Sequence, residues 1–317
     1  MELFRNANID WLGKKWYFLA FSLVFSVAGI LSMLFWHGIP KGIDFRGGTD
    51  ITVRFQQQPN PDKIRVAMDA AGLHNARIQA IGRASENEVL ISIDRQETGS
   101  ESNLTEGKAK ILQALSNAGM NNAEVVDTAV VGAVVGKQLQ RQALYATLYS
   151  LAGMLVYLWF RFELIYGVAA VVAVFHDTLI TIGAFSLTNK EISLTVIAAI
   201  LTLIGYSMND TIVVFDRIRE NLKLRRRESL AEIVNASINQ TLSRTVLTSG
   251  LTFLTVLSLY LFGGEVLHGF SFALVVGILI GTYSSIAVAA PMLVAYQESR
   301  QKSGKAAVLP AGKKARA

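Results

Sequence analysis

The stretch Trp16–Trp36, WYFLAFSLVFSVAGILSMLFW, contains 21 residues and no charged side chain. Because a helix rises about 1.5 Å per residue, this stretch is long enough to cross a hydrocarbon core of about 30 Å. A secretory signal peptide has a shorter apolar region and a small-residue cleavage site, whereas this stretch ends in MLFWHGIP (33–40). It therefore predicts an uncleaved transmembrane helix and places the chain among membrane proteins.

The rest of the chain contains five more apolar stretches of this kind. Their predicted bounds are 143–160, 164–187, 192–215, 245–262 and 267–296. The composition agrees, because 51% of the 317 residues are hydrophobic and only 17% are charged, below the roughly 25% of ordinary soluble domains. We expect an α-helical polytopic membrane protein with six transmembrane helices.

Lysine and arginine are unevenly distributed among the segments that join these spans. The segments before the first span and after the second, fourth and last spans carry 3, 1, 7 and 6 of them, whereas the two short loops opposite carry only Lys190. The positive-inside rule then predicts that both termini are cytoplasmic and that the long polar insert is extracytoplasmic. We expect the basic run KLRRRES (223–229) to contact anionic lipids, with docking of a cytoplasmic partner as the alternative.

The insert after the first span changes from solid apolar runs to alternating and amphipathic segments. Four segments read as strands, DITVRF (50–55), ARIQAIG (76–82), EVLISID (88–94) and AEVVDTAVVGA (123–133). Two read as helices, PDKIRVAMDAAG (61–72) and NLTEGKAKILQALSNAG (103–119). The resulting order, βαββαβ, predicts a small α+β domain of the ferredoxin-like type.

The predicted division of the chain follows from these segments. We expect a cytoplasmic N-terminus (1–15), a first transmembrane helix (16–36), an extracytoplasmic ferredoxin-like domain with connectors (37–137), the remaining five helices (138–296) and a basic cytoplasmic tail (297–317).

A glycine-containing segment, GIDFRGGT (42–49), lies just before the predicted domain. It is not a phosphate-binding P-loop, which requires GxxxxGK[ST] between a strand and a helix. Glycine permits backbone dihedrals that are closed to other residues, so the segment is interpreted as a tight connector. Its candidate residues are Gly42, Asp44, Phe45, Gly47 and Gly48.

Asp210 is a carboxylate within the fourth predicted span, six residues before Asp216 at the charged end of that span. A charge there costs about 2.5–3.5 kcal/mol on insertion scales, so it requires a partner, water or a proton. The fifth span begins with a polar stripe of Arg244, Thr248, Thr252 and Thr255. Because Arg244 stays protonated, it is the expected countercharge of Asp210.

Other polar side chains place a hydrophilic seam between spans three, four and five. Hydrogen bonding between helices explains many such groups, whereas intramembrane charges usually belong to an ion or substrate pathway. Reversible protonation of Asp210 beside Arg244 can link proton movement to a helix shift. Whether His176 and Asp177 conduct protons or brace helices stays open. The supporting seam residues are His176, Asp177, Tyr206, Asn209, Thr245 and Thr248.

Four motifs, in this order, resemble the SecF family, the smaller membrane subunits of the SecDF protein-export complex. They are GIDFRGGT (42–49), FHDT (175–178), SMNDTIVVFDRIREN (207–221) and SRTVLTS (243–249). The similarity extends from about Trp16 to Tyr296, and this family is similar to one half of the resistance-nodulation-division (RND) exporters.

The resemblance implies a function in protein translocation across the bacterial inner membrane. It implies SecD as the pseudo-symmetric half, SecYEG and YajC as further partners, and translocating preproteins as the substrate, with membrane lipids around the spans. It also implies that proton motive force promotes translocation and release, with Asp210 and Arg244 as the proton relay. No enzymatic activity is implied.

Two other functional classes compete with this interpretation. The first is a stand-alone RND-type proton-coupled exporter of small molecules, but six spans and one small domain provide only half of the usual bundle. The second is an intramembrane aspartyl protease that uses Asp177 and Asp210, but the chain lacks a GxGD pattern. Arg244 would also hold ionised a carboxylate that must share a proton.

Metal, cofactor and nucleic-acid functions are not expected. The chain has no cysteine and four histidines in separate segments, at 37, 74, 176 and 268, without HExxH spacing. Its basic residues flank membrane spans and do not belong to a nucleic-acid-binding fold.

Overall fold

The computed structural model describes residues 7–81, 86–94, 104–120, 122–225 and 227–302. Within them, six helices are long and apolar enough to cross a membrane, which confirms the expected number of spans. The first five are α1 (Lys15–Leu31, continued by a π-helical turn Ser32–Trp36), α5 (Ala133–Arg161), α6 (Leu164–Leu187), α7 (Leu194–Leu224) and α8 (Leu230–Phe262). The sixth consists of α9 (Glu265–Ser284), a π-helical segment (Ser285–Ala289) and α10 (Ala290–Lys302).

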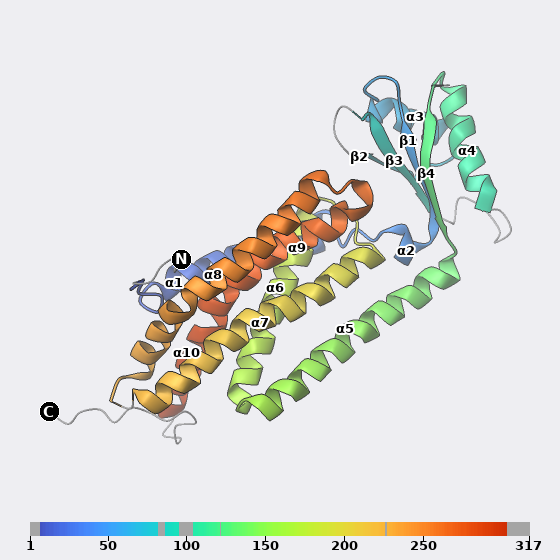
Figure 1. The fold of residues 1–317 in the computed structure, drawn as a ribbon. Coiled ribbons are helices and arrows are strands. Elements are labelled where there is room, and N and C mark those ends of the chain that lie inside the picture. Colours follow the sequence, from blue (N-terminus) through green and yellow to red (C-terminus); the bar gives the residue numbers. More distant parts are fainter. Residues whose placement is uncertain (1–6, 82–85, 95–103, 121, 226, 303–317) are drawn as a thin grey trace.

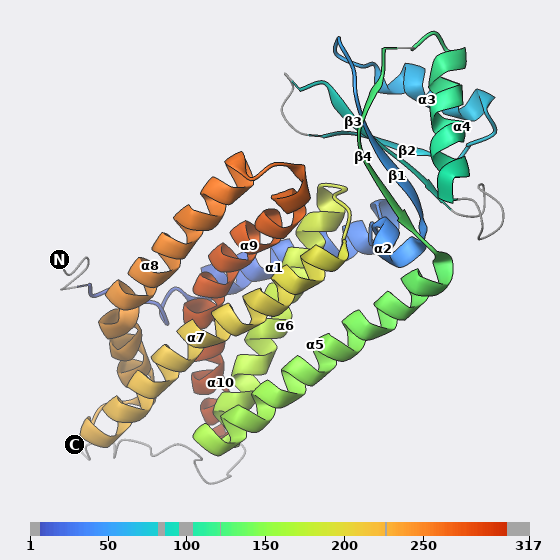
Figure 2. The ribbon, with the colours of Figure 1, turned by 45° about the vertical axis from the view of Figure 1, so that its right-hand side comes forward.

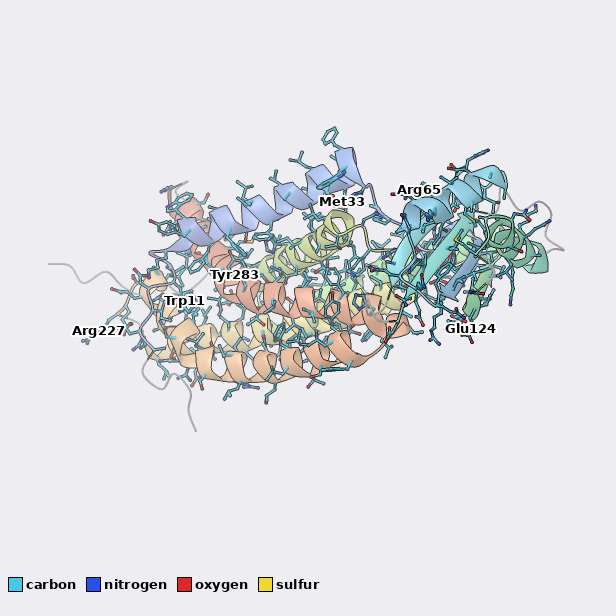
Figure 3. All side chains as sticks on the ribbon, turned by 90° about the horizontal axis from the view of Figure 1, so that it is seen from above. Trp11, Met33, Arg65, Glu124, Arg227 and Tyr283 are labelled. Atoms are coloured by element: carbon cyan, nitrogen blue, oxygen red, sulfur yellow. The ribbon has the colours of Figure 1, made fainter. Side chains whose placement is uncertain are left out.

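Helices α6, α7 and α9 form the centre of the bundle. In the spans that contain these helices, about half of the residues in the most apolar stretch are buried, against 17% or less in the spans of α1, α5 and α8. The centre packs tightly against α1, because a Cβ atom on Gly183 of α6 would lie 2.7 Å from the Cα atom of Gly29 in α1. The Tyr283 hydroxyl of α9 also bonds to α1, through the Phe18 carbonyl. Figure 3 labels Tyr283 within the bundle.

The α+β domain contains the predicted elements in the predicted order. Its strands are β1 (Gly48–Arg54), β2 (Arg77–Ile81), β3 (Glu88–Asp94) and β4 (Glu124–Val131), and its helices are α3 (Pro61–Ala70) and α4 (Leu104–Asn117). All pairings are antiparallel and the strand order is β2-β3-β1-β4, as in a ferredoxin-like unit. Both helices cover one face of the sheet (Figures 1 and 2). Ile51, Ile91, Ile64 and Ile111 pack in the core between them.

Two elements join the domain to the bundle. The first is the connector after α1, which includes the short helix α2 (Ile43–Arg46). The second is α5, which leaves β4 and runs to the opposite end of the bundle (Figure 2). Gly47 and Gly48 have positive φ values of 73° and 143°. A Cβ atom on Gly48 would lie 2.3 Å from the Ile93 carbonyl oxygen, so glycine is required where the connector enters β1.

Helices α7 and α8 are longer than the apolar runs that predicted them. The runs were 192–215 and 245–262, whereas the helices are Leu194–Leu224 and Leu230–Phe262. Their polar ends pair with each other, since the Asn221 amide donates to Ser237 Oγ at 2.8 Å. Ser229 and Glu232 form a capping box at the start of α8. The predicted tail beyond Lys302 lies outside the described residues.

Candidate functional site

Asp210 lies on α7 with only 2% of its surface exposed. Its Oδ2 atom accepts a hydrogen bond from the Ser249 hydroxyl of α8 at 2.6 Å. Its Oδ1 atom lies 3.5 Å from the side-chain amide of the neighbouring Asn209. The carboxylate therefore faces α8 in the interior of the chain and has few donors for a buried charge.

Arg244 lies on α8, five residues before Ser249, and is exposed. It acts electrostatically on Asp210, but the described residues contain no ion pair between the two within 4.0 Å. Thr248 and Asn209 are exposed as well. An exposed arginine on an apolar helix requires cover, since lipid does not solvate its charge.

Thr245 and Tyr206 contribute buried polar atoms beside this region. Thr245 Oγ1 and the Tyr206 hydroxyl are buried and have no hydrogen-bond partner within the described part of the chain. By contrast, the hydroxyls of Thr252 and Thr255, at the end of the predicted stripe, each bond to a carbonyl of their own helix at 3.0 Å.

Asp177, on α6, is 1% exposed and accepts three hydrogen bonds. Its Oδ1 atom pairs with His176 Nδ1 at 2.9 Å. Its Oδ2 atom accepts from the hydroxyls of Ser207 on α7 at 2.6 Å and of Ser284 on α9 at 2.7 Å. One carboxylate thus joins all three central helices.

The polar seam therefore includes the sixth span, which the sequence interpretation had left out. Besides Ser284, the next residue Ser285 lies 2.9 Å from the Thr211 hydroxyl of α7. Ser285 begins the π-helical segment, and such segments are frequent at functional sites. Ser207 and Ser249, which bond to the two carboxylates, were not among the residues predicted from the sequence. The run TYSS (282–285) within an apolar span was the available signal.

The connector residues meet the beginning of α7, at the end of the bundle nearest the domain. Asp44 Oδ2 accepts a hydrogen bond from the Leu194 backbone N–H at 2.7 Å. The Gly42 backbone N–H donates to the Ile192 carbonyl at 2.9 Å, and the Ile192 N–H donates to the Pro40 carbonyl at 2.7 Å. Gln140 of α5 donates its amide to the carbonyl of Phe45. The connector thus contacts two membrane helices.

An ionic cluster lies beside the connector. Arg46 bonds to Asp94 of β3 and, at 3.1 Å, to Glu191 of the loop before α7. Arg77 of β2 lies 3.4 Å from the same Glu191 carboxylate. Burial raises the pKa of Glu191, against the opposing effect of Arg46. This cluster links the α+β domain to the loop between α6 and α7.

Asp50 of β1 lies close to this cluster. Burial raises its pKa to about 7, against the lowering effect of a hydrogen bond with Ser92, and Glu191 raises it further. Its Oδ1 atom has no hydrogen-bond partner in the described part of the chain. Asp50 is therefore a carboxyl group that can change protonation state near neutral pH.

These groups form a buried polar seam between the central helices. Two buried carboxylates lie on neighbouring helices among hydroxyl groups, and an arginine lies to one side of Asp210. Among the described residues, no cluster of three or more His, Cys, Asp or Glu side chains could hold a metal ion. The fold and site define a multi-pass helical membrane protein with a buried polar seam and a small α+β domain.

Comparison with known proteins identifies the family. The model of the C-terminal region of the protein-export membrane proteins SecD and SecF matches residues 110–299, and that of the SecD/SecF GG motif matches residues 35–59. The protein translocase subunit SecF of Koribacter versatilis is 56% identical over 97% of this chain and 96% of its own. That of Calditerrivibrio nitroreducens is 44% identical over 95% and 99%.

Solved structures agree with this result. The crystal structure of SecDF, a translocon-associated membrane protein from Thermus thermophilus, has a TM-score of 0.83 and 38% sequence identity. The match covers 94% of this chain and 40% of that longer one. SecDF in a super-membrane-facing form matches the same shares with a TM-score of 0.67 and 37% identity. The chain belongs to the SecD/SecF family of protein-export membrane proteins, as a SecF-type subunit of the protein translocase. The resemblance seen in the four motifs is confirmed.

Proposed function

We propose that this chain uses proton motive force to promote the translocation and release of preproteins across the bacterial inner membrane. The observation that carries the proposal is the buried Asp210 carboxylate, bonded to Ser249 and lying near the fixed charge of Arg244. Each proton that crosses the membrane supplies about 2.3 kcal/mol per 100 mV, so a few protons can drive a mechanical step.

The relay residues Asp210 and Arg244 act at an interface with a SecD-type partner. Asn209 of α7 and Arg244 and Thr248 of α8 are all exposed. Polar groups in membrane helices normally face protein or water rather than lipid. The SecDF chain of Thermus thermophilus is longer, and this chain matches 40% of it. A pseudo-symmetric partner half would supply the missing cover for these side chains.

The α+β domain lies outside the cytoplasm, and both termini lie inside. The support is the charge distribution together with the arrangement in Figure 3, where Trp11 and Arg227 lie at one end of the molecule and Arg65 and Glu124 at the other. Basic segments that stay in the cytoplasm satisfy the positive-inside rule. In this orientation the domain meets preproteins that emerge from SecYEG, and YajC and lipids contact the membrane helices.

The connector transmits movement between the domain and the relay. Asp44 binds the first residue of α7, the helix that contains Asp210, and Arg46 joins the domain to the loop before α7. A shift of α7 that follows protonation of Asp210 is therefore transmitted through these contacts to the α+β domain. This provides a physical route from proton movement to force on a preprotein.

The test replaces Asp210 by asparagine, which keeps size and hydrogen bonding but cannot titrate. In cells depleted of the native subunit, we expect normal accumulation of the variant in the membrane and a large loss of export of a secreted protein. Thr252→Val is the matched control, because within the described residues the Thr252 hydroxyl bonds only to the Thr248 carbonyl of its own helix. Normal export by Asp210→Asn would reject the relay.

A further inference from the structure

Asp177 is a buried carboxylate that the relay of Asp210 and Arg244 does not use. It is 1% exposed and lies on α6, whereas Asp210 lies on α7 and bonds to α8. We propose that Asp177 is a second proton-binding site, in which the Ser284 hydroxyl reorients as the proton arrives. This inference rests on the proposed function, because the protons are those that the relay moves.

The contact between His176 and Asp177 is the first step. Its Nδ1 atom pairs with Asp177 Oδ1, and its Nε2 atom is buried without a hydrogen-bond partner within the described part of the chain. An imidazolium ion would have N–H donors on both nitrogens, and one of them would be buried and unsatisfied. A neutral ring that donates from Nδ1 leaves only a bare acceptor. A neutral ring can therefore make the hydrogen bond to Asp177, and the contact does not require a charge on His176.

Other helices bring no cation to Asp177 in the described part of the chain. Among the described residues, the one basic side chain within 4.0 Å of its carboxylate is His176. The groups that reach it from α7 and α9 are the hydroxyls of Ser207 and Ser284. The nearest carboxylate along α7 is Asp210, three residues beyond Ser207, and it bonds instead to Ser249. A buried carboxylate without a countercharge favours the proton-bound form.

The hydrogen bonds around Asp177 accommodate both protonation states. When ionised, it accepts from His176, Ser207 and Ser284. When a proton binds to Oδ2, the new O–H group requires an acceptor. Ser284 Oγ lies 2.7 Å away and also lies 3.1 Å from the Gly281 carbonyl. Rotation of the Ser284 O–H onto Gly281 frees Oγ to accept from Asp177, and no heavy atom has to move.

The position of Ser284 links this site to the proposed relay. Ser284 is the last residue of α9, and Ser285 after it begins the π-helical segment and contacts Thr211. Thr211 follows Asp210 directly on α7. A proton on Asp177 therefore changes hydrogen bonding at the point where α9 meets α7, one helical turn from the relay carboxylate.

Infrared spectroscopy tests the inference on the complex with its SecD-type partner in lipid bilayers. The carboxylic-acid C=O stretch reports protonation directly and is recorded between about pH 5 and about pH 9. We expect Asp177→Asn and Asp210→Asn each to remove a different titrating band. Ser284→Ala should shift the titration midpoint of the Asp177 band and leave the Asp210 band in place.

The two variants separate the outcomes. If the spectrum of Asp177→Asn equals that of the unmodified complex at every pH, Asp177 stays ionised as a structural brace and the inference is overturned. If the unmodified complex has a titrating band that Asp177→Asn removes but none that Asp210→Asn removes, the proposed relay fails while Asp177 remains a proton site. If Asp177→Asn does not accumulate, Ser284→Ala decides, because an unshifted midpoint in that variant also rejects the mechanism.

Discussion

Asp44 of the connector accepts a hydrogen bond at 2.7 Å from the backbone N–H of Leu194, the first residue of α7. The first N–H groups of a helix lack partners within the helix, and its N-terminus favours negative charge. Asp44 therefore satisfies one of these donors from a residue 150 positions away in the chain. The motif that precedes the α+β domain is thus attached to the helix that contains the proposed relay carboxylate.

Replacement of Asp44 should loosen the beginning of α7. Capping interactions of this type contribute about 1 kcal/mol, so Asp44→Ala should increase hydrogen exchange of residues 194–198 and reduce export. Asp44→Asn keeps an acceptor oxygen and should restore much of the protection. Hydrogen-exchange mass spectrometry measures both. Equal protection in Asp44→Ala and the unmodified chain would show that this contact does not hold α7.

Gly48→Ala should destabilise the α+β domain strongly. The new Cβ atom would lie 2.3 Å from the Ile93 carbonyl oxygen at a φ of 143°, and such strain costs about 1–3 kcal/mol before the clash is added. Gly72→Ala is the matched control, because Gly72 also has a positive φ, 79°, but has open space around its Cα atom. Limited proteolysis of the full chain should cut the domain of the first variant much faster than that of the control.

The stability of the α+β domain should depend on Asp50 near neutral pH. The pKa of Asp50 is raised from 3.8 to about 7 in the folded domain. Its protonated form therefore contributes to the stability of the fold, and this contribution is fully present at pH values below the pKa of Asp50 in the unfolded chain. That contribution is lost as pH rises through about 7, and it amounts to at most about 4 kcal/mol. Asp50→Asn should abolish this loss. Thermal unfolding between about pH 5 and about pH 8 measures it, and an unchanged pH dependence in the variant would assign the effect to another group.

Single cysteines should report the proposed orientation, because the chain has no cysteine of its own. Arg65 and Glu124 lie in the α+β domain and Arg227 lies at the opposite end of the molecule (Figure 3). A membrane-impermeant maleimide added outside spheroplasts should label Arg65→Cys and Glu124→Cys, and it should label Arg227→Cys only after lysis. Labelling of Arg227→Cys in intact spheroplasts would invert the topology.

Much of the architecture could be predicted from the sequence because it depends on local properties. Apolar runs such as Trp16–Trp36 must be helical in a membrane, since the backbone has no other hydrogen-bond partners there. Alternating residues in the insert predicted strands that the sheet confirms, from β1 to β4. The need for glycine at Gly47 and Gly48 could also be predicted from the sequence. The ends of α7 and α8 could not be predicted, because their polar turns are stabilised by a contact between Asn221 and Ser237.

The sequence by itself determined that Asp177 and Asp210 lie within apolar spans and require polar partners there. Only the tertiary structure decided which residues are those partners. The rotation and crossing of packed helices bring Ser207 and Ser284 to Asp177 and Ser249 to Asp210, and leave Arg244 exposed at one side. Hydropathy records how apolar a helix is, whereas the partners of one side chain depend on contacts between residues far apart in the chain.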